Sequence, residues 1–139
     1  MSDQAVLAQR QTAAECDLPT EVRAYIDAYN SRDVDGMLSV LDEDIAFQNI
    51  SGGALTDGAD GRKAFAQMAE AAVALFFERE QKVTSAITVA DTTVVRIDYR
   101  AVPAKDLPNG WRRGETVTLK GRSLFKVKDG KIKLLIDES

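Results

Sequence analysis

The chain has 139 residues, of which 45% are hydrophobic and 29% are charged, as expected for one globular domain. Its formal net charge of −4 gives no electrostatic reason to expect binding to nucleic acid or to an anionic membrane. One cysteine, Cys16, and no histidine exclude a disulfide within this sequence and a zinc cluster built on cysteine or histidine. No apolar run approaches the roughly 20 residues that span a bilayer, and the first 18 residues lack a signal-peptide core. We therefore expect a cytoplasmic protein.

The first half of the chain predicts a polar segment followed by two helices. Residues 1–18 lack a clear period and are interpreted as a flexible leader, with a single domain over residues 19–139. Pro19 suits the first turn of a helix. Asn30 to Arg32 interrupts this helix, and Asp33 is a suitable N-cap for a second helix that reaches Leu41. The apolar stripe of the first helix is formed by Val22, Tyr25, Ile26 and Tyr29.

A strand and a third helix are predicted next. Residues 43–50 alternate as a strand does, and residues 51–61 are rich in glycine and aspartate and predict a loop. A helix is expected over residues 62–77, with its apolar side chains at helical spacing.

The remainder predicts an antiparallel sheet. Strands are expected over residues 82–89, 92–102, 115–127 and 131–137, with a longer loop at residues 103–114. Asp129–Gly130 is typical of a two-residue hairpin turn. Helices followed by hairpin-linked strands indicate an α+β domain, in which a long curved sheet folds over the helices and encloses a conical pocket.

Four polar residues lie inside otherwise apolar strands. They are Asn49, Arg96, Asp98 and Asp137. Burying such groups is costly unless they are paired, so strands that curve around one cavity could bring them together as an acid–base site. Periodicity alone leaves another interpretation open. Arg96 and Asp98 share one strand face, opposite Val95 and Ile97, and that polar face could be the solvated outer surface of the sheet.

The other candidates also have two interpretations. Asp137 could be an exposed chain end, and Asn49 could mark the end of its strand. Tyr25 and Tyr29 are core residues by default, although either hydroxyl could reach the cavity.

Several segments resemble one superfamily over nearly the whole chain. They are the helix pair over residues 22–41 with its Asn30–Asp33 break, the acidic Asp42–Asp44, and Gly61–Arg62 before the third helix. A narrower signal consists of Gln48–Asn49, Arg96–Ile97–Asp98, and Gly130–Ile132 followed by Asp137. Together they resemble the limonene-1,2-epoxide hydrolase family, within the superfamily of nuclear transport factor 2, ketosteroid isomerase and SnoaL-type cyclases.

The resemblance implies a fold and a reaction. It implies an NTF2-like (cystatin-like) cone, with three helices packed on a curved, mostly antiparallel sheet. It also implies an enzyme without cofactor or metal, which converts a small, largely apolar epoxide and water to a vicinal diol. A homodimer is expected as well, because the outer apolar face of the sheet needs cover. In that family an Asp–Arg–Asp triad opens the epoxide in one step.

The residues of this mechanism are carried over by position. Asp137 would be the base that activates water, Asn49 the amide that holds it, and Asp98 the acid, with Arg96 bridging the two carboxylates. The pocket would be lined by Phe47, Tyr25, Tyr29 and Leu135.

Two departures from the family leave alternatives open. Phe47 occupies the position of a usual water-binding tyrosine, and the loop at residues 103–114 is long enough to act as a lid. The alternatives are an intramolecular epoxide-opening cyclase and a non-catalytic ligand-binding or dimerisation module. Outward-facing Arg96 and Asp98 would favour the module, because the triad would then be incomplete.

Overall fold

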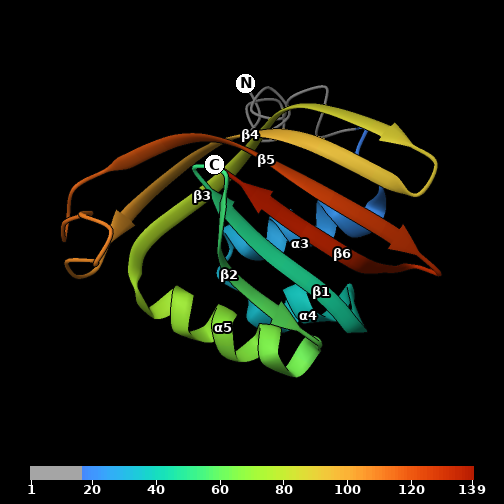
Figure 1. Ribbon diagram of the computed structural model, residues 1–139, viewed down its shortest axis with the longest axis horizontal. Coiled ribbons are helices and arrows are strands. Elements are labelled where there is room, and N and C mark those ends of the chain that lie inside the picture. Colours follow the sequence, from blue (N-terminus) through green and yellow to red (C-terminus); the bar gives the residue numbers. More distant parts are fainter. Residues whose placement is uncertain (1–16) are drawn as a thin grey trace, which may run out of the picture.

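Three helices pack on one face of a curved six-stranded sheet in the computed structural model, which describes residues 17–139 (Figure 1). The helices are α3 (Thr20–Asn30), α4 (Val34–Ser39) and α5 (Arg62–Ala74). The strands are β1 (Leu41–Ser51), β2 (Ala54–Asp60), β3 (Phe76–Val89), β4 (Thr92–Pro103), β5 (Val117–Lys128) and β6 (Lys131–Glu138). The leader expected at residues 1–18 lies almost wholly outside the described residues.

The sheet has the order β2-β1-β6-β5-β4-β3. All neighbours are antiparallel except β1 and β6, which are parallel and join the first strands to the C-terminal hairpin. This arrangement confirms the expected α+β, NTF2-like cone. It also places Asn49 of β1 directly opposite Asp137 of β6.

The helix boundaries follow local chemistry. The side chain of Asp33 accepts a hydrogen bond from the backbone N–H of Gly36 at 2.9 Å, so the predicted N-cap of α4 is confirmed. Helix α5 ends at Ala74 rather than Phe77. The Arg32 guanidinium donates to the backbone carbonyls of Val73, Phe76 and Phe77, which satisfies carbonyl groups where the helix ends and β3 begins.

Two strand predictions need correction. The segment expected to be a loop contains β2, which turns back on β1 through Gly52 and Gly53, both at positive φ. Strand β3 begins at Phe76, six residues before the predicted Lys82. The intervening Glu78–Gln81 stretch is mostly charged or polar on both faces, which obscured its alternation.

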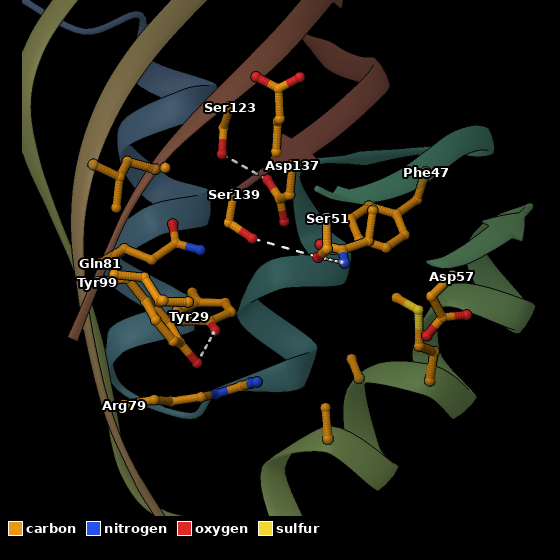
Figure 2. A pocket seen from close by; sticks show the side chains of 18 of the residues that line it. Tyr29, Phe47, Ser51, Asp57, Arg79, Gln81, Tyr99, Ser123, Asp137 and Ser139 are labelled. Atoms are coloured by element: carbon orange, nitrogen blue, oxygen red, sulfur yellow. Dashed lines mark hydrogen bonds between the residues drawn. The ribbon is translucent and has the colours of Figure 1, made fainter. Parts of the chain in front are cut away.

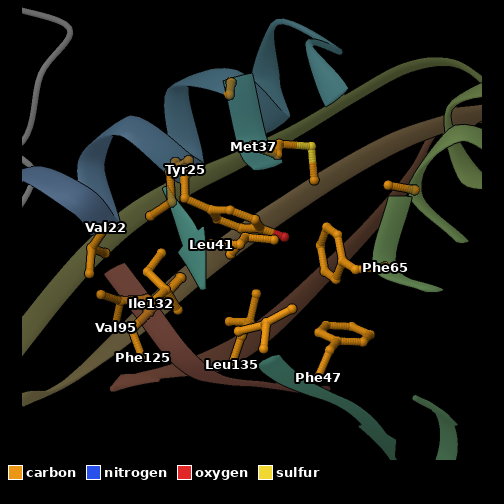
Figure 3. Packing of buried hydrophobic residues seen from close by; sticks show 14 of the residues in the cluster. Val22, Tyr25, Met37, Leu41, Phe47, Phe65, Val95, Phe125, Ile132 and Leu135 are labelled. Atoms are coloured by element: carbon orange, nitrogen blue, oxygen red, sulfur yellow. The ribbon is translucent and has the colours of Figure 1, made fainter. Parts of the chain in front are cut away.

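Aromatic side chains form the centre of the core between sheet and helices (Figure 3). Tyr25 makes edge-on contacts with Phe65 and Phe125, and Phe47 packs edge-on against Phe65 at 5.4 Å between ring centroids. Leu135 is fully buried in this cluster and does not line the cavity, so its predicted place in the substrate pocket is wrong. Leu135 belongs to the hydrophobic core next to the cavity.

No helix within residues 17–139 is long and apolar enough to cross a membrane.

Candidate active site

A cavity of about 460 Å³ lies between the inner face of the sheet and the helices α3 and α5. All six strands contribute to its lining, as do the loop after β4 and the C-terminal Ser139. Most of the lining is apolar, and a small number of polar groups converge on the space (Figure 2). This is the usual composition of a site for a small molecule.

Asp137 is one of three side-chain carboxylates that line the cavity, the others being those of Asp57 and Glu138. It lies on β6, partly buried, and the Ser123 hydroxyl on β5 donates a hydrogen bond to its Oδ1 at 2.6 Å. Burial raises the pKa of Asp137 to about 6, and the Ser123 hydrogen bond acts against that rise. A carboxylate with this pKa is ionised at neutral pH yet more basic than an ordinary aspartate, which suits it to take up a proton.

Two tyrosine hydroxyls lie near this carboxylate. The Tyr29 hydroxyl of α3 donates to the Tyr99 hydroxyl of β4 at 3.4 Å. Burial is the main cause that raises the pKa of both tyrosines, and the negative charge of Asp137 adds to it. Both hydroxyls therefore stay protonated at neutral pH. Since Tyr29 donates its proton to Tyr99, the Tyr99 hydroxyl is the one left to donate a hydrogen bond into the cavity. Tyr25 lies deeper, with a pKa raised by burial and by Asp137.

Arg79 closes the side of the cavity beyond the tyrosines. Its guanidinium carbon lies 4.1 Å from the centroid of the Tyr29 ring. The positive charge lowers the pKa of Tyr29 and Tyr99, opposing the effect of Asp137 on the same groups. The tyrosine pair thus lies between a cation and a carboxylate, in the order that Figure 2 shows.

Arg96 and Asp98 lie outside the cavity. Both are exposed, because the alternation of β4 buries Val95 and Ile97 on the inner face. Asp98 is within 3.5 Å of Lys120 across the outer surface of the sheet. The expectation that these two residues share a site with Asp137 is wrong, and the structure does not assemble an Asp–Arg–Asp triad. The cost of burying their charges favours the outer face.

Asn49 does lie in the cavity wall near Asp137. Its Nδ2 donates to the Thr56 hydroxyl at 2.9 Å and to the Ser51 hydroxyl at 3.4 Å. Phe47, Tyr25 and Tyr29 also line the cavity, in the places expected of pocket residues.

The loop after β4 contributes Leu107, Asn109 and Trp111 to the lining. The Trp111 ring packs edge-on against Phe76, with centroids 6.2 Å apart. The long loop therefore takes part in the pocket wall, and its action as a lid stays a prediction.

Sequence reasoning missed Arg79 and Gln81. Both lie on the part of β3 that was not predicted as strand, and both side chains are buried. Every second residue from Arg79 to Val83 is buried, so extending the predicted strand back from Val83 would have placed both side chains on the inner face.

Replacing Ser123 by alanine should raise the pKa of Asp137 further. The Ser123 hydroxyl stabilises the ionised carboxylate, and alanine cannot replace that hydrogen bond. Carboxyl-carbon NMR titration of Asp137 measures the change. Ser51→Ala is the matched control, because the Ser51 hydroxyl contacts Asn49 and Ser139 instead. An unchanged or lowered midpoint in Ser123→Ala would contradict the assigned hydrogen bond.

The curved sheet, the helices that cover it and the cavity between them define an α+β cone of the NTF2-like type. The model of the SnoaL-like domain matches residues 22–135, and the chain belongs to this family. A comparison with curated proteins gave no significant match.

Solved structures share the fold. A protein with a ketosteroid isomerase-like fold from Catenulispora acidiphila, in complex with trimethylamine, has a TM-score of 0.71 at 16% identity over 86% of this chain and 84% of that one. A candidate polyketide cyclase from Xanthomonas campestris has a TM-score of 0.67 at 25% identity over 86% and 87%. An epoxide hydrolase from M. tuberculosis, like limonene-1,2-epoxide hydrolase, has a TM-score of 0.68 at 18% identity over 85% and 78%.

Proposed function

We propose that this protein is a cofactor-independent enzyme that removes a proton from carbon next to a carbonyl group in a small, largely apolar substrate. One observation carries the proposal: a single carboxylate with a pKa of about 6 shares an apolar cavity with two protonated tyrosine hydroxyls. General-base catalysis is most effective when the pKa of the base lies near the working pH.

The proposed reaction needs only these groups. Asp137 takes the proton from the carbon, and the electron pair of the broken C–H bond moves to the carbonyl oxygen. The Tyr99 hydroxyl, which accepts the hydrogen bond of Tyr29, donates its own proton in a hydrogen bond to the enolate oxygen that forms, which is where charge develops. Where the substrate has a conjugating double bond, the enolate takes the proton back from Asp137 at the far end of that system, which is an isomerisation. Otherwise the enolate carbon attacks a second carbonyl and closes a ring, and the new alkoxide takes the proton from Asp137. The candidate polyketide cyclase among the structural neighbours is consistent with the second outcome.

Hydrogen exchange with solvent tests this proposal without knowledge of the natural substrate. A panel of cyclic and aromatic ketones and 1,3-diketones, incubated with the protein in D₂O, should contain members that gain deuterium next to the carbonyl faster than in buffer. Proton NMR measures the loss of that signal. A panel without enzyme-dependent exchange, under conditions where the protein is folded, counts against the proposal.

Epoxide opening is the second candidate, and the position of Asn49 favours it. Asn49 and Asp137 are directly paired across β1 and β6, so an amide and a carboxylate border one point of the cavity and could hold a water molecule between them. The Tyr99 hydroxyl, rather than Asp98, would then donate to the epoxide oxygen. The M. tuberculosis hydrolase among the structural neighbours is consistent with this reaction.

Labelled water separates the two reactions. An epoxide panel in H₂¹⁸O should give ¹⁸O-labelled diols if water attacks, and unlabelled cyclic ethers if a hydroxyl of the substrate attacks instead. Ketone exchange without diol formation supports the first proposal. If neither panel reacts, the protein is better described as a non-catalytic module that binds a ligand.

A homodimer stays a proposal. An apolar row crosses four strands on the outer face of the sheet. Its members are paired in register and are Ile87, Val94, Leu124 and Ile136. A second copy could cover this row. The cytoplasmic location and the absence of nucleic-acid and membrane partners likewise stay predictions from the sequence.

A further inference from the structure

Arg79 is a buried cation without a partner of opposite charge. Its exposed fraction is 8%, and its guanidinium forms no ion pair or hydrogen bond with the side chains and backbone of residues 17–139. Its contacts are the faces of two aromatic rings, Tyr29 at 4.1 Å and Phe76 at 5.9 Å from the guanidinium carbon. The Nε atom is fully buried and has no acceptor.

Aromatic rings compensate such a charge only in part. The attraction between a cation and a ring face is much smaller than the cost of burying a charge that lacks a counter-ion. The planar guanidinium can also donate parallel hydrogen bonds to the two oxygens of a carboxylate. An arginine left in this state beside a cavity is therefore suited to a ligand that brings the missing negative charge.

Gln81 supplies a second unpaired group on the same strand face. It lies two residues from Arg79, has an exposed fraction of 7%, and its Oε1 has no hydrogen-bond partner within the described chain. Its backbone is fixed by Asn30, whose side chain pairs with both the N–H and the carbonyl of Gln81. Both Arg79 and Gln81 line the cavity (Figure 2). Two buried polar groups without hydrogen-bond partners, at the same end of the cavity, indicate a binding subsite for a polar ligand.

The carboxylate of Asp137 does not fill this role. No ion pair among the described residues joins Arg79 to Asp137, and Tyr29 and Tyr99 lie between the two side chains (Figure 2). The cation and the base therefore occupy different ends of the cavity.

We propose that Arg79 and Gln81 form an anchoring subsite for a carboxylate group of the substrate. The substrate class is then a small keto acid, or a related acid, with an apolar body. Arg79 binds the carboxylate, and the Gln81 amide contacts a hydroxyl or N–H next to it. The carbonyl oxygen then reaches the tyrosine pair, and the reacting carbon lies toward Asp137. The orientation of the reacting carbon rests on the proposed function, whereas binding of the carboxylate does not.

Trp111 offers a direct binding assay. It is the only tryptophan of the chain, and it packs against Phe76, the ring that also borders Arg79. Cyclohexanecarboxylate and cyclohexanecarboxamide are probes of the same shape that differ in charge and do not absorb where tryptophan does. Titration of the full chain, followed by Trp111 fluorescence and by calorimetry, should show at least about tenfold tighter binding of the carboxylate.

Variants of Arg79 test whether this residue causes the preference for the carboxylate probe. Arg79→Met keeps a long apolar side chain and should abolish the preference for carboxylate over carboxamide, whereas Arg79→Lys should keep part of it. Circular dichroism and the melting temperature check folding, which Arg79→Met should not impair because it removes an uncompensated charge. Equal binding of the two probes to the parent protein, or no saturable binding of either, overturns the inference, as does a preference that survives in Arg79→Met.

Asp137→Asn separates this inference from the proposed reaction. The variant should keep the carboxylate preference, because Asp137 lies at the other end of the cavity, and it should lose hydrogen exchange. Exchange by the parent protein without a carboxylate preference would refute the subsite alone. A carboxylate preference without exchange on any ketone would refute the reaction alone.

Discussion

Asp137→Asn should lower kcat/KM for proton exchange by about 10²- to 10⁴-fold, the usual contribution of a general base. Asparagine keeps the shape of the side chain and can still accept the Ser123 hydrogen bond, but it cannot take up a proton. In the parent protein kcat/KM should rise with pH through about 6 and then stay level, because Asp137 must be ionised to act. The variant should lose this ascending limb.

Asp98→Asn is the matched control. It makes the same chemical change on the outer face of the sheet, where Asp98 contacts Lys120 and not the cavity. Its activity should stay within about twofold of the parent, since exposed ion pairs contribute little. A loss in Asp98→Asn as large as that in Asp137→Asn would contradict the placement of β4 and restore the triad that the sequence suggested. Deuterium exchange, followed by NMR at several pH values, measures both variants.

The fold was predictable because its signals are local. The helix stripe that includes Tyr25, the N-cap at Asp33 and the hairpin turn at Asp129–Gly130 each depend on neighbouring residues, and each was found in the structure. Strand β2 was missed, since its residues are largely exposed and carry no alternating apolar pattern. Such an edge strand is specified by its partner β1 more than by its own sequence.

The site was only partly predictable, because it depends on which face of each strand points inward. Asp137 and Asn49 lie in the cavity as predicted. Arg96 and Asp98 do not, since the buried face of β4 carries Val95 and Ile97. Periodicity favoured this outward placement, and the family resemblance led the prediction away from it. Arg79 was hidden for a different reason: flanking glutamates give its segment the composition of a solvated surface.

Asp137→Asn should also stabilise the fold at pH 8, by up to about 3 kcal/mol. Burial raises the pKa of this carboxyl from 3.8 in the unfolded chain to about 6 in the folded one. Each unit corresponds to about 1.4 kcal/mol of free energy of unfolding. Because the folded pKa is the higher one, the folded state disfavours the ionised form. This destabilising contribution is complete above pH 6, and it shrinks as the pH falls toward 3.8.

Urea denaturation of the parent, Asp137→Asn and Asp98→Asn at pH 8 and near pH 4 measures this contribution. Asp137→Asn should gain stability at pH 8 and lose most of that gain near pH 4, where the parent's carboxyl is protonated in the folded state. Asp98→Asn should differ from the parent by less than about 0.5 kcal/mol at pH 8, as expected for an exposed side chain. A destabilised Asp137→Asn at pH 8 would mean that the carboxylate is held by favourable contacts and serves the fold. A gain confined to high pH would instead show that the fold carries an unfavourable charge, as catalytic sites commonly do.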